Sequence, residues 1–142
     1  MLTLRLIMED FIQKKYSDHS YSYLGDLIRP SSNTSIKVYH PFYHIHFKDK
    51  PTLCIVGIQP DRIMFLCLEG IKKIQDFERG ITSYLMWFLE SDGKIYGKHK
   101  SDIYSIEYVL TGFKNAKHID ANPLNNQLNN LINPGEKKNE TK

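Results

Sequence analysis

The sequence predicts an α+β domain in which an N-terminal amphipathic helix packs on a mainly antiparallel, curled β-sheet of about six to eight strands. Apolar side chains recur at helical spacing near the N-terminus, whereas short strand-like segments separated by turn residues follow from residue 36 onward. The chain has 142 residues, close to the commonest domain size. We therefore expect a single globular domain over 1–120 and a polar C-terminal extension over 121–142.

The N-terminal helix is the clearest element. Its apolar residues occupy positions i, i+3, i+4, i+7 and i+8, and Thr3 precedes them as a candidate N-cap. These residues are Leu4, Ile7, Met8, Phe11 and Ile12. The pattern over 20–28 is ambiguous, and a short second helix that ends before Pro30 is one interpretation. The composition of 30–35 predicts a loop.

Four segments in the first half of the chain show strand signals. Residues 36–39 and 42–48 are short candidates separated by Pro41. Residues 52–58 and 63–68 are continuously apolar, which is typical of central strands covered on both faces.

Pro60 and Asp61 stand between the two apolar segments, where they predict a type I turn. A hairpin symmetric about this pair places Cys54 opposite Cys67. We interpret the two cysteines as buried thiols that act as small hydrophobic groups, with a redox pair as the alternative.

The second half of the chain repeats these signals. Residues 71–80 predict a short helix, and 81–90 favour a strand over a helix because β-branched and aromatic residues are frequent there. Asp92-Gly93 is the strongest hairpin signal in the chain. Alternation over 103–110 predicts another strand, with a short one at 117–120. In the extension, the spacing of apolar residues predicts a short helix over 124–132, followed by a flexible tail.

Composition and charge exclude several classes of protein. A formal charge of +3, from 19 basic and 16 acidic residues, is too small to indicate a dedicated nucleic-acid binder or a membrane-surface protein. The longest apolar stretch is far shorter than the roughly 20 residues of a spanning helix, and no signal peptide is apparent. Two cysteines do not make a disulfide framework, so we expect a cytoplasmic, reducing setting. The preference for Ile and Lys suggests an AT-rich genome.

The segment YHPFYHIHF, residues 39–47, is the most distinctive motif. In a strand, His44 and His46 share one face with Phe42, while Tyr43 and Ile45 share the face turned toward the core. Two imidazoles on one face could be metal ligands or simply the polar side of a half-buried strand. A metal site also needs a third ligand, and the spacing selects none. We therefore expect no metal and no other cofactor.

The densest basic stretch is KIYGKHK, which we expect to form a loop that binds a partner through Lys94, Tyr96, Lys98, His99 and Lys100. The sequence contains no nucleophile elbow, phosphate-binding glycine loop or zinc-type cysteine spacing, and Glu107 has no evident partner. A catalytic function is therefore the less favoured expectation.

The sequence best fits a small intracellular accessory protein, of the immunity or inhibitor type, that binds another protein. The first alternative is nucleic-acid binding through residues 94–100. The second is a metal-dependent enzyme that uses His44 and His46.

Overall fold

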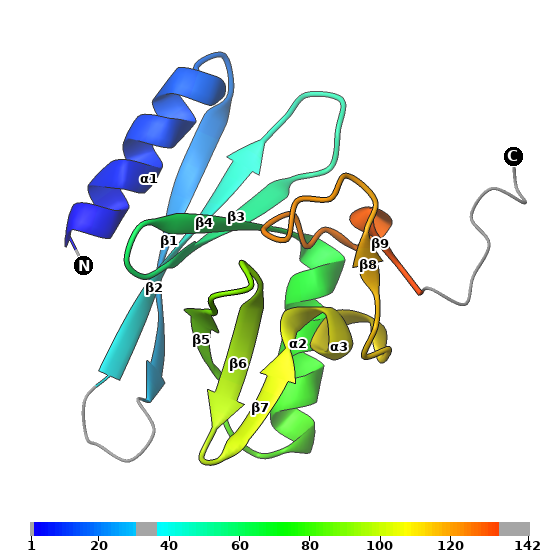
Figure 1. Ribbon diagram of the computed structural model, residues 1–142. Coiled ribbons are helices and arrows are strands. Elements are labelled where there is room, and N and C mark those ends of the chain that lie inside the picture. Colours follow the sequence, from blue (N-terminus) through cyan, green and yellow to red (C-terminus); the bar gives the residue numbers. More distant parts are fainter. Residues whose placement is uncertain (1, 31–36, 134–142) are drawn as a thin grey trace, which may run out of the picture.

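The computed structural model describes residues 2–30 and 37–133 and confirms an α+β fold (Figure 1). In chain order the elements are α1 (Leu2–Lys15), β1 (Ser20–Pro30), β2 (Lys37–His46), β3 (Leu53–Ile58), β4 (Arg62–Cys67), α2 (Leu68–Gly80), β5 (Met86–Leu89), β6 (Ile95–His99), β7 (Asp102–Ser105), α3 (Ile106–Thr111), β8 (Lys117–His118), the 3-10 helix η1 (Leu128–Asn130) and β9 (Leu131–Ile132). The expected loop at 30–35, except Pro30, and the tail after residue 133 lie outside the described residues. None of the described helices is long and apolar enough to cross a membrane.

The centre of the molecule is a four-stranded antiparallel sheet of order β1-β2-β3-β4, whose strand β3 is buried at all six positions. The helix α1 covers one face, where its apolar stripe packs on residues that include Tyr43, Ile45 and Ile55. The helices α2 and α3 and the sheet of β5, β6 and β7 lie on the other side (Figure 1), and their side chains join those of β3 and β4 in one apolar cluster. This double covering is the reason that residues 52–58 are apolar without alternation.

Gly57 allows α1 to approach β3 closely. A Cβ atom at this position would lie 2.7 Å from Met8 Sδ and 2.9 Å from Leu4 Cδ2, closer than van der Waals contact permits. Any larger residue here would therefore push α1 away from the sheet.

Three local expectations for the N-terminal half are wrong. The helix α1 begins at Leu2, so Thr3 lies inside its first turn and is not the N-cap. Residues 20–28 belong to strand β1, because pairing with β2 decides a locally ambiguous segment. The strand β2 continues through Pro41, since β3 pairs with β2 only over 42–45 and Pro41 lies beyond that ladder.

The hairpin of β3 and β4 forms as expected, but its register is shifted by one residue. Ile58 pairs with Arg62 across a three-residue turn, so Cys54 lies opposite Leu66, and Cys67 lies opposite Leu53. The predicted pairing of Cys54 with Cys67 is therefore wrong. The pairing differs because the turn contains Gln59, Pro60 and Asp61, one residue more than the predicted turn of Pro60 and Asp61.

The second sheet, of order β5-β6-β7, confirms a strand within 81–90 and the turn at Asp92-Gly93. The expected strand over 103–110 is correct only to Ser105. The Ser105 hydroxyl accepts a hydrogen bond of 3.1 Å from the Tyr108 N–H, which caps a helix that begins at Ile106. Local capping therefore overrides the two-residue alternation that predicted a longer strand.

The C-terminal segment packs along β4. The Phe65 N–H donates to the Leu124 carbonyl at 2.8 Å, and the Asn126 N–H donates to the Phe65 carbonyl at 2.8 Å. The expected helix over 124–132 is replaced by η1 and β9, which pairs with β8. The strand expected at 117–120 forms only over Lys117–His118, as β8.

The helix α2 ends in a Schellman motif with threonine at the left-handed position. The Ser83 N–H donates to the Glu78 carbonyl at 3.0 Å and the Thr82 N–H donates to the Arg79 carbonyl at 3.2 Å. Thr82 has a φ of 55°, where a β-branched side chain is strained and glycine is usual.

We expect Thr82→Gly to raise the free energy of unfolding by about 1 kcal/mol, because it removes this strain. Urea denaturation followed by Trp87 fluorescence measures the change. The reverse control is Gly112→Ala, since Gly112 has a φ of 82° and no atom within 4 Å of an added Cβ. That variant should lose about 1 kcal/mol. Equal or lower stability of Thr82→Gly would contradict the assignment of strain.

Candidate functional site

The three histidines of β2 have different surroundings. His40 is completely buried and its Nδ1 lies 2.9 Å from the Gly57 carbonyl oxygen. His44 is half-buried with its ring centroid 5.2 Å from that of Phe42, and His46 Nε2 lies 3.1 Å from Ser22 Oγ. Tyr43 and Ile45 are buried under α1, as the alternation predicted.

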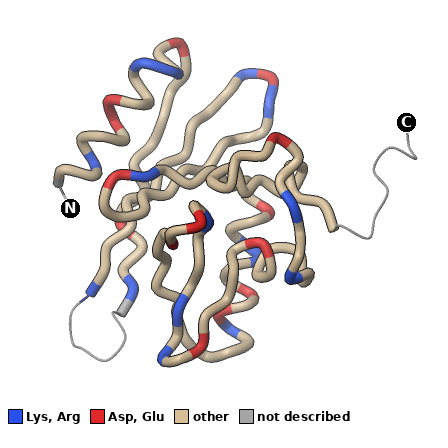
Figure 2. The backbone as a smooth tube through the Cα atoms, in the orientation of Figure 1, with Lys and Arg blue, Asp and Glu red and all other residues tan. Residues whose placement is uncertain are grey.

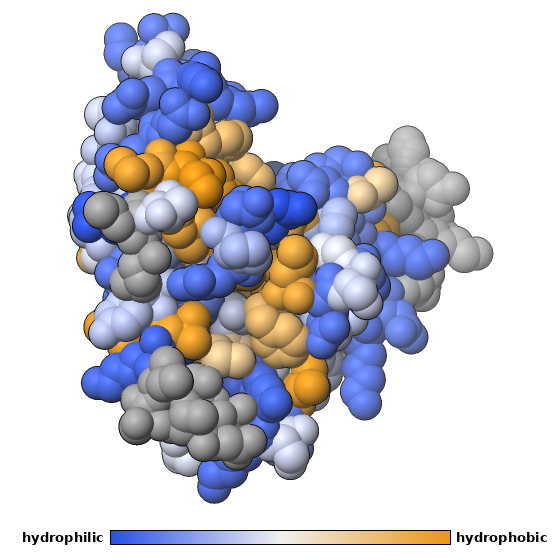
Figure 3. Space-filling model, turned by 60° about the vertical axis from the view of Figure 1, so that its left-hand side comes forward, coloured by the Kyte–Doolittle hydropathy of each residue, from blue (hydrophilic) through white to orange (hydrophobic). Residues whose placement is uncertain are grey.

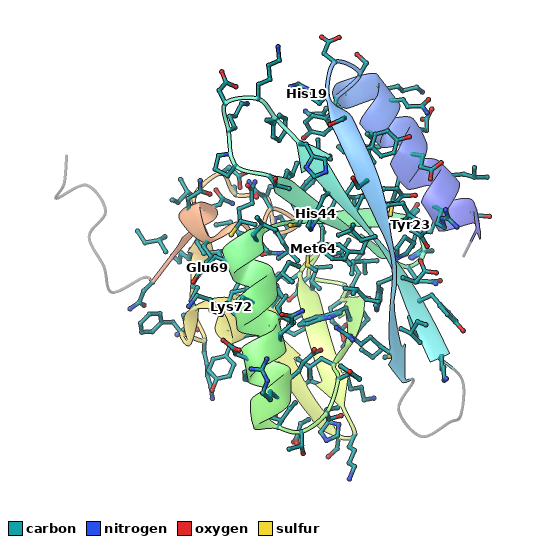
Figure 4. The ribbon with its side chains drawn as sticks, turned by 180° about the vertical axis from the view of Figure 1, so that it is seen from behind. His19, Tyr23, His44, Met64, Glu69 and Lys72 are labelled. Carbon is teal, nitrogen blue, oxygen red and sulfur yellow. The ribbon has the colours of Figure 1, made fainter. Side chains whose placement is uncertain are left out.

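His44 and His46 are neighbours, with ring centroids 6.1 Å apart. Within residues 2–30 and 37–133, no group of three or more histidine, cysteine, aspartate or glutamate side chains could hold a metal ion. His19 lies at the connection between α1 and β1, away from His44 on the sheet (Figure 4). In this part of the chain, the histidine pair therefore has no third ligand.

The basic stretch at 94–100 is a strand and not a loop, which corrects the expected form of the site. The strand β6 holds Tyr96, Lys98 and His99, while Lys94 precedes it and Lys100 follows it (Figure 2). These residues are therefore spread along the length of a hairpin, and the structure does not gather them at one point.

Two of these residues already have partners within the domain. The Tyr96 hydroxyl donates to Asp92 Oδ2 at 2.7 Å, and this bond together with burial raises the pKa of Tyr96 to about 12. His99 Nδ1 lies 2.8 Å from Ser83 Oγ. A partner that binds along β6 would therefore contact mainly the lysines.

A buried carboxylate and an imidazole meet where the sequence indicated no partner. His118 Nε2 lies 2.7 Å from Asn126 Oδ1 and 3.3 Å from Glu107 Oε2. We assign the hydrogen bond to Asn126 because its distance is shorter, and Glu107 Oε2 then has no hydrogen-bond partner among the described residues. His118 and Glu107 are thus in contact without a hydrogen bond between them. No sequence signal could have found it, because the three residues lie in three different segments.

A buried ion pair joins the central sheet to α2. Arg29 Nη2 lies 3.3 Å from Glu78 Oε1, and the Leu85 N–H donates to Glu78 Oε2 at 2.9 Å. Burial lowers the pKa of Arg29 and raises the pKa of Glu78. The pair links β1, α2 and the segment before β5, which gives it a structural role.

An open pocket of about 830 Å³ lies beside this ion pair and is lined in part by Glu78, Thr82, Ser83 and Tyr84. The hydrogen bond of Ser83 with His99 resembles the hydroxyl–imidazole pair of nucleophilic enzymes. In the described part of the chain, no carboxylate lies within 4.0 Å of His99. The pair therefore lacks the third group that orients a catalytic base there.

The two cysteines are free, and Cys54 is buried. Burial raises the pKa of the Cys54 thiol to about 12, which keeps it protonated and unreactive near neutral pH.

The outer edge of β1 is the most prominent unpaired feature of the surface. This strand of 11 residues pairs with β2 on one side, and no other described strand pairs with it. Large apolar and aromatic side chains of β1 are exposed, and we name them together with the strand edge the edge surface. They are Tyr21, Tyr23, Leu24 and Ile28.

Comparisons of the chain with protein-family models, with curated proteins and with solved structures found no match.

The buried His40 generates a pH prediction. Burial lowers its pKa to about 4 from an ordinary value of 6.5, so the folded protein disfavours the proton that the unfolded chain accepts. The contribution of His40 to the free energy of unfolding is therefore fully present above pH 6.5. It is lost as the pH falls from 6.5 to 4, by about 3 kcal/mol in total. Urea denaturation from pH 7 to pH 4 measures this slope.

In the variant His40→Phe, the contribution of this residue to the slope should disappear, although stability at pH 7 falls with the lost hydrogen bond. A slope unchanged by His40→Phe would contradict the assignment.

We expect protein purified without an affinity tag to contain no stoichiometric transition metal, since His44 and His46 lack a third ligand in the described part of the chain. Elemental analysis of the original protein and of the double variant His44→Ala/His46→Ala should give the same result. Stoichiometric metal that disappears in the double variant would reinstate the metal site.

Proposed function

We propose that the protein acts by binding another protein, and that the edge surface is where an extended segment of this partner adds to the sheet. The observation that carries this proposal is the difference between the two edges of the central sheet. Residues 124–126 cover the β4 edge through two backbone hydrogen bonds of 2.8 Å, whereas no described strand covers β1. Unpaired backbone groups on an edge strand are a template for another chain.

The side chains of β1 suit an interface. Tyr21 and Tyr23 pair with Ile45 and Tyr43, so they stand on the α1 side of the sheet. The Arg5 guanidinium lies 3.9 Å from the centre of the Tyr23 ring, which gives the tyrosine a fixed orientation. Tyrosine and arginine are frequent among the residues that contribute most to protein–protein binding.

The edge carries only part of the usual protection against pairing, namely a bulge, Asp26 and Pro30. Lysines commonly prevent strands from associating, yet β1 contains none, and Arg29 is turned inward to Glu78. Its bulge between Tyr23 and Gly25, at Leu24, interrupts the pairing at a single point. Figure 3 shows hydrophobic side chains that reach the surface on the α1 side of the molecule, with hydrophilic ones around them.

This function belongs to the class of immunity or inhibitor proteins, which act by occupying a partner's surface. Such proteins need a rigid scaffold and an exposed recognition element, and not a catalytic centre. The buried sheet supports the edge surface in this way.

We expect Leu24→Lys to weaken partner binding, because a lysine on the edge strand opposes strand addition. Affinity capture from lysate of the source cells, quantified by mass spectrometry, should recover a specific partner with the original protein. Recovery should fall at least about tenfold with Leu24→Lys, equivalent to about 1.4 kcal/mol.

The matched control is Leu68→Lys, since Leu24 is 48% exposed and Leu68, at the start of α2, is 51% exposed. It should keep full recovery. Identical capture by Leu24→Lys and the original protein would overturn the proposed surface.

A further inference from the structure

A second surface feature is independent of the edge surface. An open pocket of about 680 Å³ lies between the turn that joins β5 to β6 and the segment that leads into β8. Lys94 and Asp92 contribute from the turn, and Lys114, Lys117 and His118 contribute from the segment. The topology therefore brings Lys94 close to Lys114 and Lys117, which follow it by 20 or more positions in the sequence.

The lysines of this pocket form no close salt bridge in the described part of the chain, although Lys94 is near enough to Asp92 to help lower the pKa of that carboxyl. Among the described residues, no carboxylate lies within 4.0 Å of the ammonium groups of Lys94, Lys114 or Lys117. Asp92 is the one acidic residue in the lining, and it already accepts hydrogen bonds from the Tyr96 hydroxyl at 2.7 Å and the Lys94 N–H at 2.9 Å. The pocket is therefore electropositive.

The wall of the pocket is fixed by the His118 contacts. His118 Nε2 is held 2.7 Å from Asn126 Oδ1, with the buried Glu107 behind it. His118 Nδ1 has no hydrogen-bond partner among the described residues. Asn115 adds an amide, while Ala121 and Pro123 add apolar surface. The pocket thus combines lysine side chains, hydrogen-bonding groups and a small apolar wall.

This geometry points to a binding site for a small molecule that carries a phosphate group. Lysine ammonium groups bind phosphate as point charges, and the volume lies within the range of small-ligand pockets. The apolar surface of Ala121 and Pro123 would contact the part of the ligand that bears the phosphate.

The size of the pocket favours a small ligand over a nucleic acid. A nucleic-acid strand needs a continuous basic track, whereas Lys98 and Lys100 lie at the other end of β6, where His99 pairs with Asp102 of β7. The structure therefore divides the basic stretch 94–100, and only Lys94 belongs to the pocket.

Titration calorimetry with inorganic phosphate, AMP and adenosine as probes, at low ionic strength, tests the site. We expect saturable binding of phosphate and AMP that weakens with added salt, and no binding of adenosine. Lys94→Ala, Lys114→Ala and Lys117→Ala should each raise the Kd for AMP by about tenfold or more. All three side chains are exposed or at the rim, so the thermal unfolding midpoint should stay unchanged.

The matched controls are Lys98→Ala and Lys100→Ala, which remove the same charge from the same hairpin and should leave the Kd within about twofold. Absence of saturable binding by phosphate and AMP, or binding of adenosine as tight as that of AMP, would overturn the site. The site would also be overturned if Lys98→Ala and Lys100→Ala weakened AMP binding as much as the pocket variants do. Tighter binding of an oligonucleotide than of AMP, through Lys98 and Lys100, would have the same consequence.

Discussion

Burial of β3 on both faces is the constraint on which the rest of the structure depends. All six residues of the strand are buried, so each neighbouring layer must supply an apolar surface. The helix α1 does so on one side and can approach only because Gly57 has no side chain. On the other side, residues of α2, α3 and the second sheet complete the larger cluster. Burial of apolar surface is the dominant favourable contribution to folding, and this double covering places it at the centre of the molecule.

The polar groups inside this arrangement hold the layers in register. The pair of Arg29 and Glu78 connects the end of β1 to α2, and the Leu85 N–H extends the connection to the second sheet. His40 connects β2 to β3 through the Gly57 carbonyl. Each such group is costly to bury alone, so its partner specifies one alignment of the elements. The two proposed binding features lie at the periphery of this scaffold, where strand β1 has no neighbour and where the β5–β6 turn meets the segment before β8.

The candidate sites show how far sequence reasoning reaches. The alternation around His44 and His46 correctly placed Tyr43 and Ile45 in the core, because a strand has a fixed period of two. The basic stretch at 94–100 predicted a single binding site, because residues adjacent in sequence were expected to lie together in space. A strand separates Lys94 from Lys100, while chain reversal at α3 brings Lys114 and Lys117 to Lys94. Likewise, Glu107 and His118 meet only because α3 and β8 fold back on one another.

The sequence by itself determined the helix α1, the apolar hairpin of β3 and β4, the helix α2 and the turn at Asp92-Gly93, because periodicity and turn chemistry act over a few neighbouring residues. Only the tertiary structure decided that 20–28 is a strand, that the β3–β4 turn has three residues and that 124–132 lies along β4 instead of forming a helix. Those outcomes depend on hydrogen bonds and burial between distant segments. Their free energy is absent from any short window of the chain, so local propensity could not predict them.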